Sequence, residues 1–281
     1  MTKPKVVMGQ GNIIEPTAVI GGEIHLGNGN YVGHFAVLTG PITLGDGNTI
    51  SHHAVLVGPL TVGDGNYIGP HVTFGTAPQH NLLRWEVNPP PGEEHVIRIG
   101  NQNIFREYTT IHQPTESLTS IGDACYLMAY SHVPHDALLE DGVILANSVQ
   151  IGGHTWIGQG ANIGLGAVIH QHSSIGAYVM VGMDTVVNRD VPPFVMAAGN
   201  PVRVVGLNRV GLRRYDFRAS ELSAVRAALR ALPARGGAEQ FAALPERVAR
   251  AMQAFAERSR RPRARYGERR ARGTSPTTEE L

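Results

Sequence analysis

An apolar residue recurs at every sixth position over most of this chain. The first run extends from Ile14 to Phe74, the repeat returns at Ile99, and after one change of phase it continues from Ile121 to Val187. This period differs from the 3.6 residues of an α-helix and the two residues of a strand. It is typical of a parallel β-helix, in which three six-residue segments form one triangular coil. The repeat predicts a β-solenoid in which residues about 18 apart stack, with the apolar residues inside the prism.

The repeat also divides the chain into parts. Residues 1–204 are expected to form the solenoid, interrupted by a proline-rich excursion at 76–97. An irregular segment of this length on a rigid scaffold is usually functional. Residues 205–259 carry apolar residues at helical spacing and are expected to form a small helical domain that covers the open end of the solenoid. Residues 260–281 are rich in arginine and are expected to be a disordered tail, with docking of an acidic carrier protein or of nucleic acid as alternatives.

Composition narrows the functional class. The net charge is only +1, so the molecule as a whole is not an obvious nucleic-acid binder. The single cysteine, Cys125, excludes an internal disulfide and fits a reducing compartment, and we interpret it as a packed thiol rather than a nucleophile. The sequence contains no run of about 18 apolar residues. We therefore expect a cytoplasmic protein without stable membrane insertion.

Histidines gather at related positions of the repeat. Stacking by 18 residues places His135 beside Gly153 and Asp136 beside His154, and His170 follows Gly152 by the same interval. These residues are therefore expected to lie together on one edge of the solenoid, across three coils.

A histidine with an adjacent acid and a facing backbone amide suits acyl transfer. His135 would remove a proton from an acceptor hydroxyl, and Asp136 would fix its tautomer. The Gly153 N–H would stabilise the oxyanion, so no serine or cysteine nucleophile is needed. Two alternatives remain open: corner histidines that only hydrogen-bond the next coil, and a zinc site shared between neighbouring subunits, as in the gamma-class carbonic anhydrases.

Several segments resemble one family of hexapeptide-repeat enzymes. Residues 105–115 (FREYTTIHQPT) and 127–136 (LMAYSHVPHD) are similar to two motifs of the UDP-N-acetylglucosamine 3-O-acyltransferases that begin lipid A synthesis. Residues 144–147 (ILAN), 175–182 (IGAYVMVG) and 190–195 (DVPPFV) follow in the order and near the spacing of that family. The resemblance runs from about residue 10 to about residue 217.

This resemblance implies a fold, partners and site residues. The fold would be a left-handed parallel β-helix followed by a small α-helical domain, assembled as a homotrimer with active sites between adjacent prisms. The donor would be an acyl carrier protein thioester, with acyl coenzyme A as an alternative, and the acceptor a UDP-amino sugar; no cofactor and no metal are implied. The catalytic residues would be His135, Asp136 and Gly153. The residues that would contact substrates are Gln79, His80, Arg84, His112, His132, His154, His170, Gln171, Asn208 and Arg214.

Departures from the family pattern concern the acceptor and the acyl chain. His80 stands where the family usually has an aspartate, Val210 replaces a glutamate, and Tyr215 replaces the second of two arginines. A related acyltransferase with a different nucleotide sugar is therefore an alternative reading. Met183 occupies a position that is glycine in long-chain enzymes of the family, which predicts a shorter acyl group or, alternatively, ordinary packing.

Overall fold

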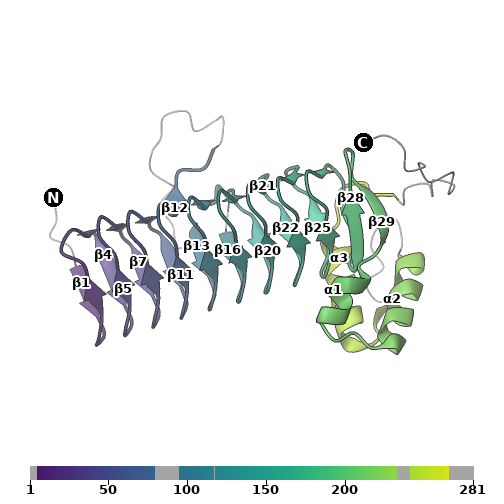
Figure 1. Ribbon diagram of the computed structural model, residues 1–281, viewed down its shortest axis with the longest axis horizontal. Helices are drawn as coiled ribbons and strands as arrows, with labels where there is room; N and C mark the ends of the chain where they lie inside the picture. Colours follow the sequence, from purple (N-terminus) through teal and green to yellow (C-terminus); the bar gives the residue numbers. More distant parts are fainter. Residues whose placement is uncertain (1–4, 80–94, 117, 233–240, 266–281) are drawn as a thin grey trace, which may run out of the picture.

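The fold is described from a computed structural model that covers residues 5–79, 95–116, 118–232 and 241–265. Three parallel β-sheets form the faces of a long prism, and three helices lie at its C-terminal end (Figure 1). Each coil contributes one short strand to each sheet. The predicted parallel β-solenoid with a small C-terminal helical region is therefore confirmed.

The strands of each sheet follow one another along the prism. Sheet A contains β1 (Lys5–Met8), β4 (Glu23–Leu26), β7 (Ile42–Leu44), β10 (Leu60–Val62), β13 (Val96–Ile99), β16 (Leu118–Ile121), β19 (Leu138–Leu139), β22 (Trp156–Ile157) and β25 (Ser174–Ile175). Sheet B contains β2 (Ile13–Ile14), β5 (Tyr31–Val32), β8 (Thr49–Ile50), β11 (Tyr67–Ile68), β14 (Ile104–Phe105), β17 (Tyr126–Leu127), β20 (Ile144–Leu145), β23 (Asn162–Ile163), β26 (Met180–Val181), β28 (Val195–Ala198) and β29 (Arg203–Leu207). Sheet C contains β3 (Val19–Gly21), β6 (Val37–Thr39), β9 (Val55–Val57), β12 (Thr73–Thr76), β15 (Thr110–His112), β18 (His132–Val133), β21 (Gln150–Ile151), β24 (Val168–Ile169) and β27 (Val186–Val187).

Two insertions lengthen the interval between paired residues, but the strands on either side of each insertion still pair in the same sheets. Most paired residues are 18 apart, as in Leu145 with Ile163. Leu60, however, pairs with Ile97, and Val96 pairs with Leu118, which are separations of 37 and 22 residues. The extra residues lie between β12 and β13 and between β15 and β16, so both insertions leave the prism at the corner between sheets C and A. The inward side chains stay in phase on either side, because burial of the apolar repeat fixes the register.

The interior of the prism is a continuous column of apolar side chains. Val32, Ile50 and Ile68 are fully buried on successive coils, and the rings of Phe74 and Phe105 meet edge to face at 4.9 Å. Burial of a side chain of this size stabilises the folded state by about 1.5–3 kcal/mol. The six-residue spacing thus produces a core one side chain wide.

A ladder of buried asparagines accompanies this core at the corner between sheets A and B. The side-chain oxygen of Asn30 accepts the N–H of Asn48 at 2.8 Å, and that of Asn48 accepts the N–H of Asn66 at 2.9 Å. The Asn48 amide also donates to the carbonyl of Gly63 at 2.9 Å. Each asparagine therefore satisfies backbone groups that the tight corner would leave unpaired.

Replacing Asn48 with alanine should lower the free energy of unfolding by about 2–4 kcal/mol, because the Asn66 N–H and the Gly63 carbonyl lose their buried partner. Urea unfolding measures the change. Asn28→Ala is the matched control, since the Asn28 side-chain oxygen accepts the N–H of Gln10 at 2.9 Å on the solvent-exposed side of the same corner. Equal losses in the two variants would contradict the role assigned to burial.

The C-terminal helices close the end of the prism. Helices α1 (Arg209–Arg214), α2 (Ala219–Ala231) and α3 (Glu246–Arg258) follow the antiparallel pair β28–β29. A second apolar cluster joins them to the last coils through Tyr178, Phe194, Phe217 and Met252. Helices therefore cover the end of the solenoid, as predicted, although the hairpin continues to Leu207 rather than ending at residue 204.

The last described residues do not follow the prediction of a tail that begins at residue 260. Residues 259–265 return to the prism, where Arg263 forms a parallel bridge with Asp190 and Ala264 donates to the Asp190 carbonyl at 2.8 Å. Residues 266–281 lie outside the described residues, so the prediction for them stands untested. Of the helices described, none combines the length and apolar character that crossing a bilayer requires.

Candidate active site

His135 and Asp136 lie at the corner between sheets C and A, directly after β18. Asp136 adopts a left-handed backbone conformation with φ 57°, which turns the chain sharply towards β19. The His135 Nδ1 atom lies 2.9 Å from Asp136 Oδ2, and the two side chains are 12% and 4% exposed. The corner thus joins an acid and an imidazole in a largely buried pair, as the sequence predicts.

The second insertion wraps around the Asp136 carboxylate. Its Oδ2 atom accepts the Thr115 hydroxyl at 2.6 Å and the Thr115 N–H at 3.0 Å, while Oδ1 accepts the Glu116 N–H at 3.0 Å. The Asp136 N–H donates to the Thr119 hydroxyl at 2.9 Å. These donors stabilise the negative charge and hold the carboxylate against His135.

The orientation of His135 defines its chemistry. With Nδ1–H donated to the carboxylate, Nε2 carries the lone pair that can accept a proton. Gly153, one coil further on, faces this atom: a Cβ added at position 153 would lie 2.6 Å from His135 Nε2 and 2.5 Å from Cε1. A glycine is required because any larger residue would displace the ring. Among the described residues, the Gly153 N–H donates to no acceptor, so it is available to a ligand beside the imidazole.

A groove of about 410 Å³ opens along sheet C beside this pair. His132, Gln150 and His170 line it together with His135 and Gly153, and Gln79 lies at the point where the first insertion leaves the prism. The His170 Nδ1–H donates to the carbonyl of Gln171 at 2.9 Å. This bond orients the His170 ring and leaves its Nε2 atom free of that contact. The sequence-predicted residues His132, His170 and Gln171 are therefore brought to one surface with the catalytic pair.

Two neighbouring histidines are held in their neutral form. The rings of His112 and His132 meet edge to face at 4.7 Å. Burial, followed by the charges of His132 and His135, lowers the pKa of His112 to about 4. Burial and the charge of His135 also lower the pKa of His132, whose Nδ1 atom lies 2.8 Å from the Thr110 hydroxyl. At neutral pH these rings offer hydrogen bonds rather than charge.

The low pKa of His112 predicts a loss of stability in mild acid. Below about pH 6.5 the unfolded chain takes up a proton that the folded chain refuses until about pH 4, so the free energy of unfolding falls across this range. In His112→Asn this contribution, up to about 3 kcal/mol, should disappear. Urea unfolding at a series of pH values from 4 to 8 checks it. Parallel curves for the variant and the wild type would show that His112 does not cause the acid sensitivity.

His154 lies on the other side of the carboxylate. Its Nε2 atom is 3.9 Å from Asp136 Oδ2, and its ring stacks on His172 at 4.5 Å. One ligand atom each from His135, Asp136 and His154 falls within 4.8 Å of the others, a spacing that can hold a metal ion. However, Asp136 Oδ2 already accepts hydrogen bonds from Thr115 and His135, so these donors occupy positions that a cation would take. The hydrogen bonding fits an acid–imidazole pair better than a metal site.

Comparison with known proteins places the chain among acyltransferases of one family. Residues 190–264 match the model of the UDP-N-acetylglucosamine O-acyltransferase family, domain 2. The solved structure of LpxA from Acinetobacter baumannii is 31% identical and covers 92% of this chain and 100% of that chain, with a TM-score of 0.72. A second structure, of a UDP-N-acetylglucosamine acyltransferase, is 30% identical over 92% of this chain and 99% of that chain, with a TM-score of 0.74.

The chain belongs to the UDP-N-acetylglucosamine O-acyltransferase family. A sequence relative, the acyl-[acyl-carrier-protein]–UDP-N-acetylglucosamine O-acyltransferase of Synechocystis sp., is 46% identical over 141 residues, which is 50% of this chain and 51% of the relative. The chain therefore spans about half the length of that relative, whereas the match to the Acinetobacter baumannii structure covers 92% of this chain and all of that chain.

The remaining residues that the acyltransferase resemblance implies fall into two groups. His80 and Arg84 lie outside the described residues. Asn208, Arg214 and Met183 are described, but they do not line the groove of the single chain. The Asn208 amide donates to the Tyr178 carbonyl at 2.9 Å and accepts the Gly211 N–H at 3.0 Å, so it caps α1. Their roles in substrate binding stay predictions.

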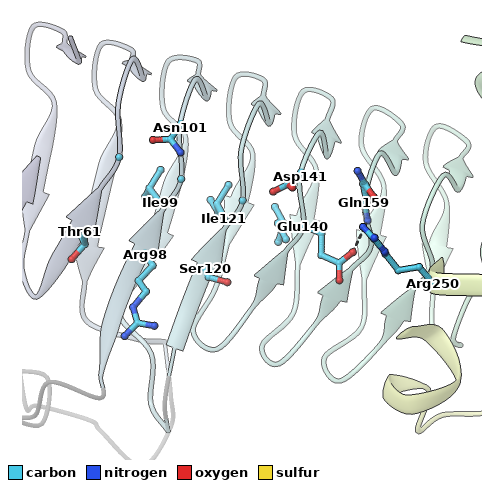
Figure 2. A pocket seen from close by; sticks show the side chains of 14 residues that line it. Thr61, Arg98, Ile99, Asn101, Ser120, Ile121, Glu140, Asp141, Gln159 and Arg250 are labelled. Carbon is cyan, nitrogen blue, oxygen red and sulfur yellow. Dashed lines mark hydrogen bonds between the residues drawn. The ribbon is translucent and has the colours of Figure 1, made fainter. Parts of the chain in front are cut away.

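A larger groove of about 700 Å³ lies on the outer face of sheet A. Figure 2 shows Glu140, Gln159 and Arg250 at one end of it and Arg98 at the other. The Glu140 carboxylate accepts the Gln159 N–H at 2.9 Å and the Trp156 indole N–H at 3.0 Å, so it joins adjacent coils (Figure 2). Its lining contains no imidazole, so among the described residues the acid–imidazole pair is found at the smaller groove on sheet C.

The cysteine expectation is also met. Cys125 is 1% exposed, and its thiol donates to the Glu140 carbonyl at 3.2 Å. Burial raises the pKa of Cys125 to about 12. A thiol that stays protonated at neutral pH is a packing residue rather than a nucleophile.

Proposed function

We propose that this chain transfers an acyl group from an acyl carrier protein thioester to a hydroxyl of UDP-N-acetylglucosamine. The observation that carries the proposal is the pair His135–Asp136 beside Gly153, whose N–H has no acceptor within the described part of the chain, at the edge of an open groove. The acyl carrier protein and UDP-N-acetylglucosamine are the substrates in the name of the Synechocystis relative. Membership in the same family supports their use by this chain.

The geometry accounts for each step of the transfer. His135 Nε2 takes the proton of the sugar hydroxyl as its oxygen attacks the thioester carbonyl. The carbonyl electrons move onto oxygen, where the Gly153 N–H stabilises the tetrahedral oxyanion. Collapse breaks the carbon–sulfur bond, and the imidazolium of His135 returns its proton to the departing thiolate. Asp136 stabilises that imidazolium through Nδ1, and the chemistry requires no prosthetic group.

The active unit in this proposal is a homotrimer, supported by the distribution of apolar side chains on the surface. Beyond β1, the large exposed apolar residues of the described strands and corners lie on sheets B and C or on the corner between them, rather than on sheet A. Stacked rings run along that corner from Phe35 to Tyr130. An apolar surface of this extent favours burial against other copies.

This arrangement bears on the acyl-length prediction. Met183 lies at the same corner and is 70% exposed in the single chain. If Met183 limits acyl length, the corner that carries it must therefore pack against another copy in the trimer, next to the groove of one of the copies.

An acyl-transfer assay tests the proposal. The purified full chain is incubated with UDP-N-acetylglucosamine and 3-hydroxyacyl carrier proteins of several chain lengths, and products are identified by mass spectrometry. We expect an O-acylated nucleotide sugar, with preference for a shorter chain. A trimeric protein that forms no product with this acceptor overturns the acceptor assignment, and parallel reactions with other UDP-amino sugars and with acyl coenzyme A identify the alternatives.

A further inference from the structure

Residues 259–265, here called the C-terminal segment, extend sheet A beyond the last coil. Val191 forms a parallel bridge with Ile175, and Arg263 forms the next one with Asp190. The Asp190 N–H donates to the Pro262 carbonyl at 3.1 Å, and the Val204 N–H donates to the Arg265 carbonyl at 2.9 Å. The segment thus adds a further strand-like layer to the edge of the sheet.

A buried carboxylate anchors this segment. Asp190 is fully buried, and its side chain accepts the Ser174 N–H at 2.8 Å from the last coil of sheet A. From the C-terminal segment it accepts the Ser259 hydroxyl at 2.9 Å and the Arg261 N–H at 2.8 Å. Three donors on one buried carboxylate fix the position of Arg261 relative to the solenoid.

The Arg261 side chain extends from this anchor towards the groove. Its Nη1 donates to the carbonyl of Gln171 at 3.2 Å, and Nη2 contacts the carbonyl of Asn188 at 3.5 Å. The same Gln171 oxygen accepts His170 Nδ1–H at 2.9 Å. The oxygen that orients the His170 ring is therefore held in turn by a guanidinium from the far end of the chain.

We infer that Arg261 is a positioning residue of the active site: it fixes the Gln171 carbonyl, and this carbonyl directs His170 Nε2 into the substrate groove. A carbonyl can only accept, so it keeps the proton of neutral His170 on Nδ1 and leaves Nε2 as the acceptor. The N–H of the same peptide, that of His172, donates to the Gly153 carbonyl at 2.9 Å, so loss of Arg261 removes the contact on the carbonyl side alone and holds the His170 ring less firmly.

Steady-state kinetics test the effect of Arg261 on substrate binding, and this test rests on the proposed acyl transfer. Arg261→Ala should raise the KM of the substrate that His170 contacts about tenfold, the loss expected for one hydrogen bond to a charged group, with kcat changed far less. Arg261→Lys should recover part of the affinity, because an ammonium group reaches one carbonyl. The matched control is Arg265→Ala. Arg265 belongs to the same segment, but its side chain is exposed and its contact with Val204 is made by the backbone, which alanine keeps. Identical KM values in Arg261→Ala and Arg265→Ala overturn the inference, as does a loss confined to kcat.

Hydrogen–deuterium exchange provides a readout that does not depend on activity. The His172 N–H shares a peptide unit with the Gln171 carbonyl and donates to the Gly153 carbonyl, and the His170 N–H on the preceding side of Gln171 donates to the Val187 carbonyl. Exchange of the segment around residues 170–172 should accelerate in Arg261→Ala and stay unchanged in Arg265→Ala. If the wild-type protein shows no acyl transfer, the proposed function fails while this measurement still decides the coupling. Unchanged exchange in Arg261→Ala overturns the inference even in an active enzyme.

Discussion

Replacing His135 with alanine should lower kcat of acyl transfer by about 10²- to 10⁴-fold, the usual contribution of a general base. The variant removes the nitrogen that accepts the hydroxyl proton and returns it to the thiolate. Asp136 keeps its bonds to Thr115 and Glu116, so the corner should remain folded. Single-turnover measurements with acyl carrier protein thioester separate this chemical step from product release.

The control for this variant is His172→Ala. His172 stacks on His154 one coil away and forms part of the same polar edge, but it does not touch the Asp136 carboxylate in the contacts described. It should transfer the acyl group at a rate close to that of the wild type. If His135→Ala does the same while keeping its oligomeric state, His135 is not the base, and the proposed mechanism is wrong.

Gly153→Ala should lower kcat by about 10²- to 10³-fold through a single added methyl group. The new Cβ would stand 2.5 Å from the His135 ring, so the imidazole must move away from both the hydroxyl and the thioester. A displacement of about 1 Å is enough to cost about 10²-fold in rate. The clash involves a side chain rather than the backbone, so the melting temperature should change little. Activity and melting temperature measured together check both parts.

Two comparisons make this prediction specific. Gly21→Ala in sheet C places its Cβ where no atom lies within 4 Å, so it should be neutral in activity and stability. The double variant His135→Ala/Gly153→Ala should be little worse than His135→Ala alone, because the methyl group acts through the imidazole. Fully multiplicative losses would show instead that Gly153 acts independently of His135, through its amide alone.

Regular parts of the site were predictable because the repeat supplies a coordinate system. Counting 18 residues places Gly153 against His135 and His154 against Asp136, and both contacts occur in the structure. Thr115 escaped this counting. It lies 21 residues before Asp136, in an insertion that breaks the interval, yet it is the residue that donates most closely to the catalytic carboxylate. Counting by 18 missed Thr115 because the insertion shifts the local register, and the repeat does not predict how the inserted residues fold.

The C-terminal segment illustrates a different failure. An arginine-rich stretch reads as a solvated tail, because charged side chains favour water. In the structure its backbone completes a sheet edge and its hydroxyl and amide groups satisfy the buried Asp190. The capping of α1 by the Asn208 amide was not anticipated either, and its predicted role in substrate binding stays a prediction. Composition describes side chains, and these contacts depend on backbone groups from distant parts of the chain.

The sequence by itself determined the prism, its phase along most of the chain and the pairing of His135 with Gly153, because burial of an apolar residue at every sixth position permits one register. The tertiary structure alone decided how the second insertion closes around Asp136 and how Arg261 reaches the Gln171 carbonyl. Those contacts join groups from an insertion and from the C-terminal segment, 20 and 90 positions away, both of which lie outside the six-residue repeat. They form because buried polar groups must find partners wherever the folded chain brings them.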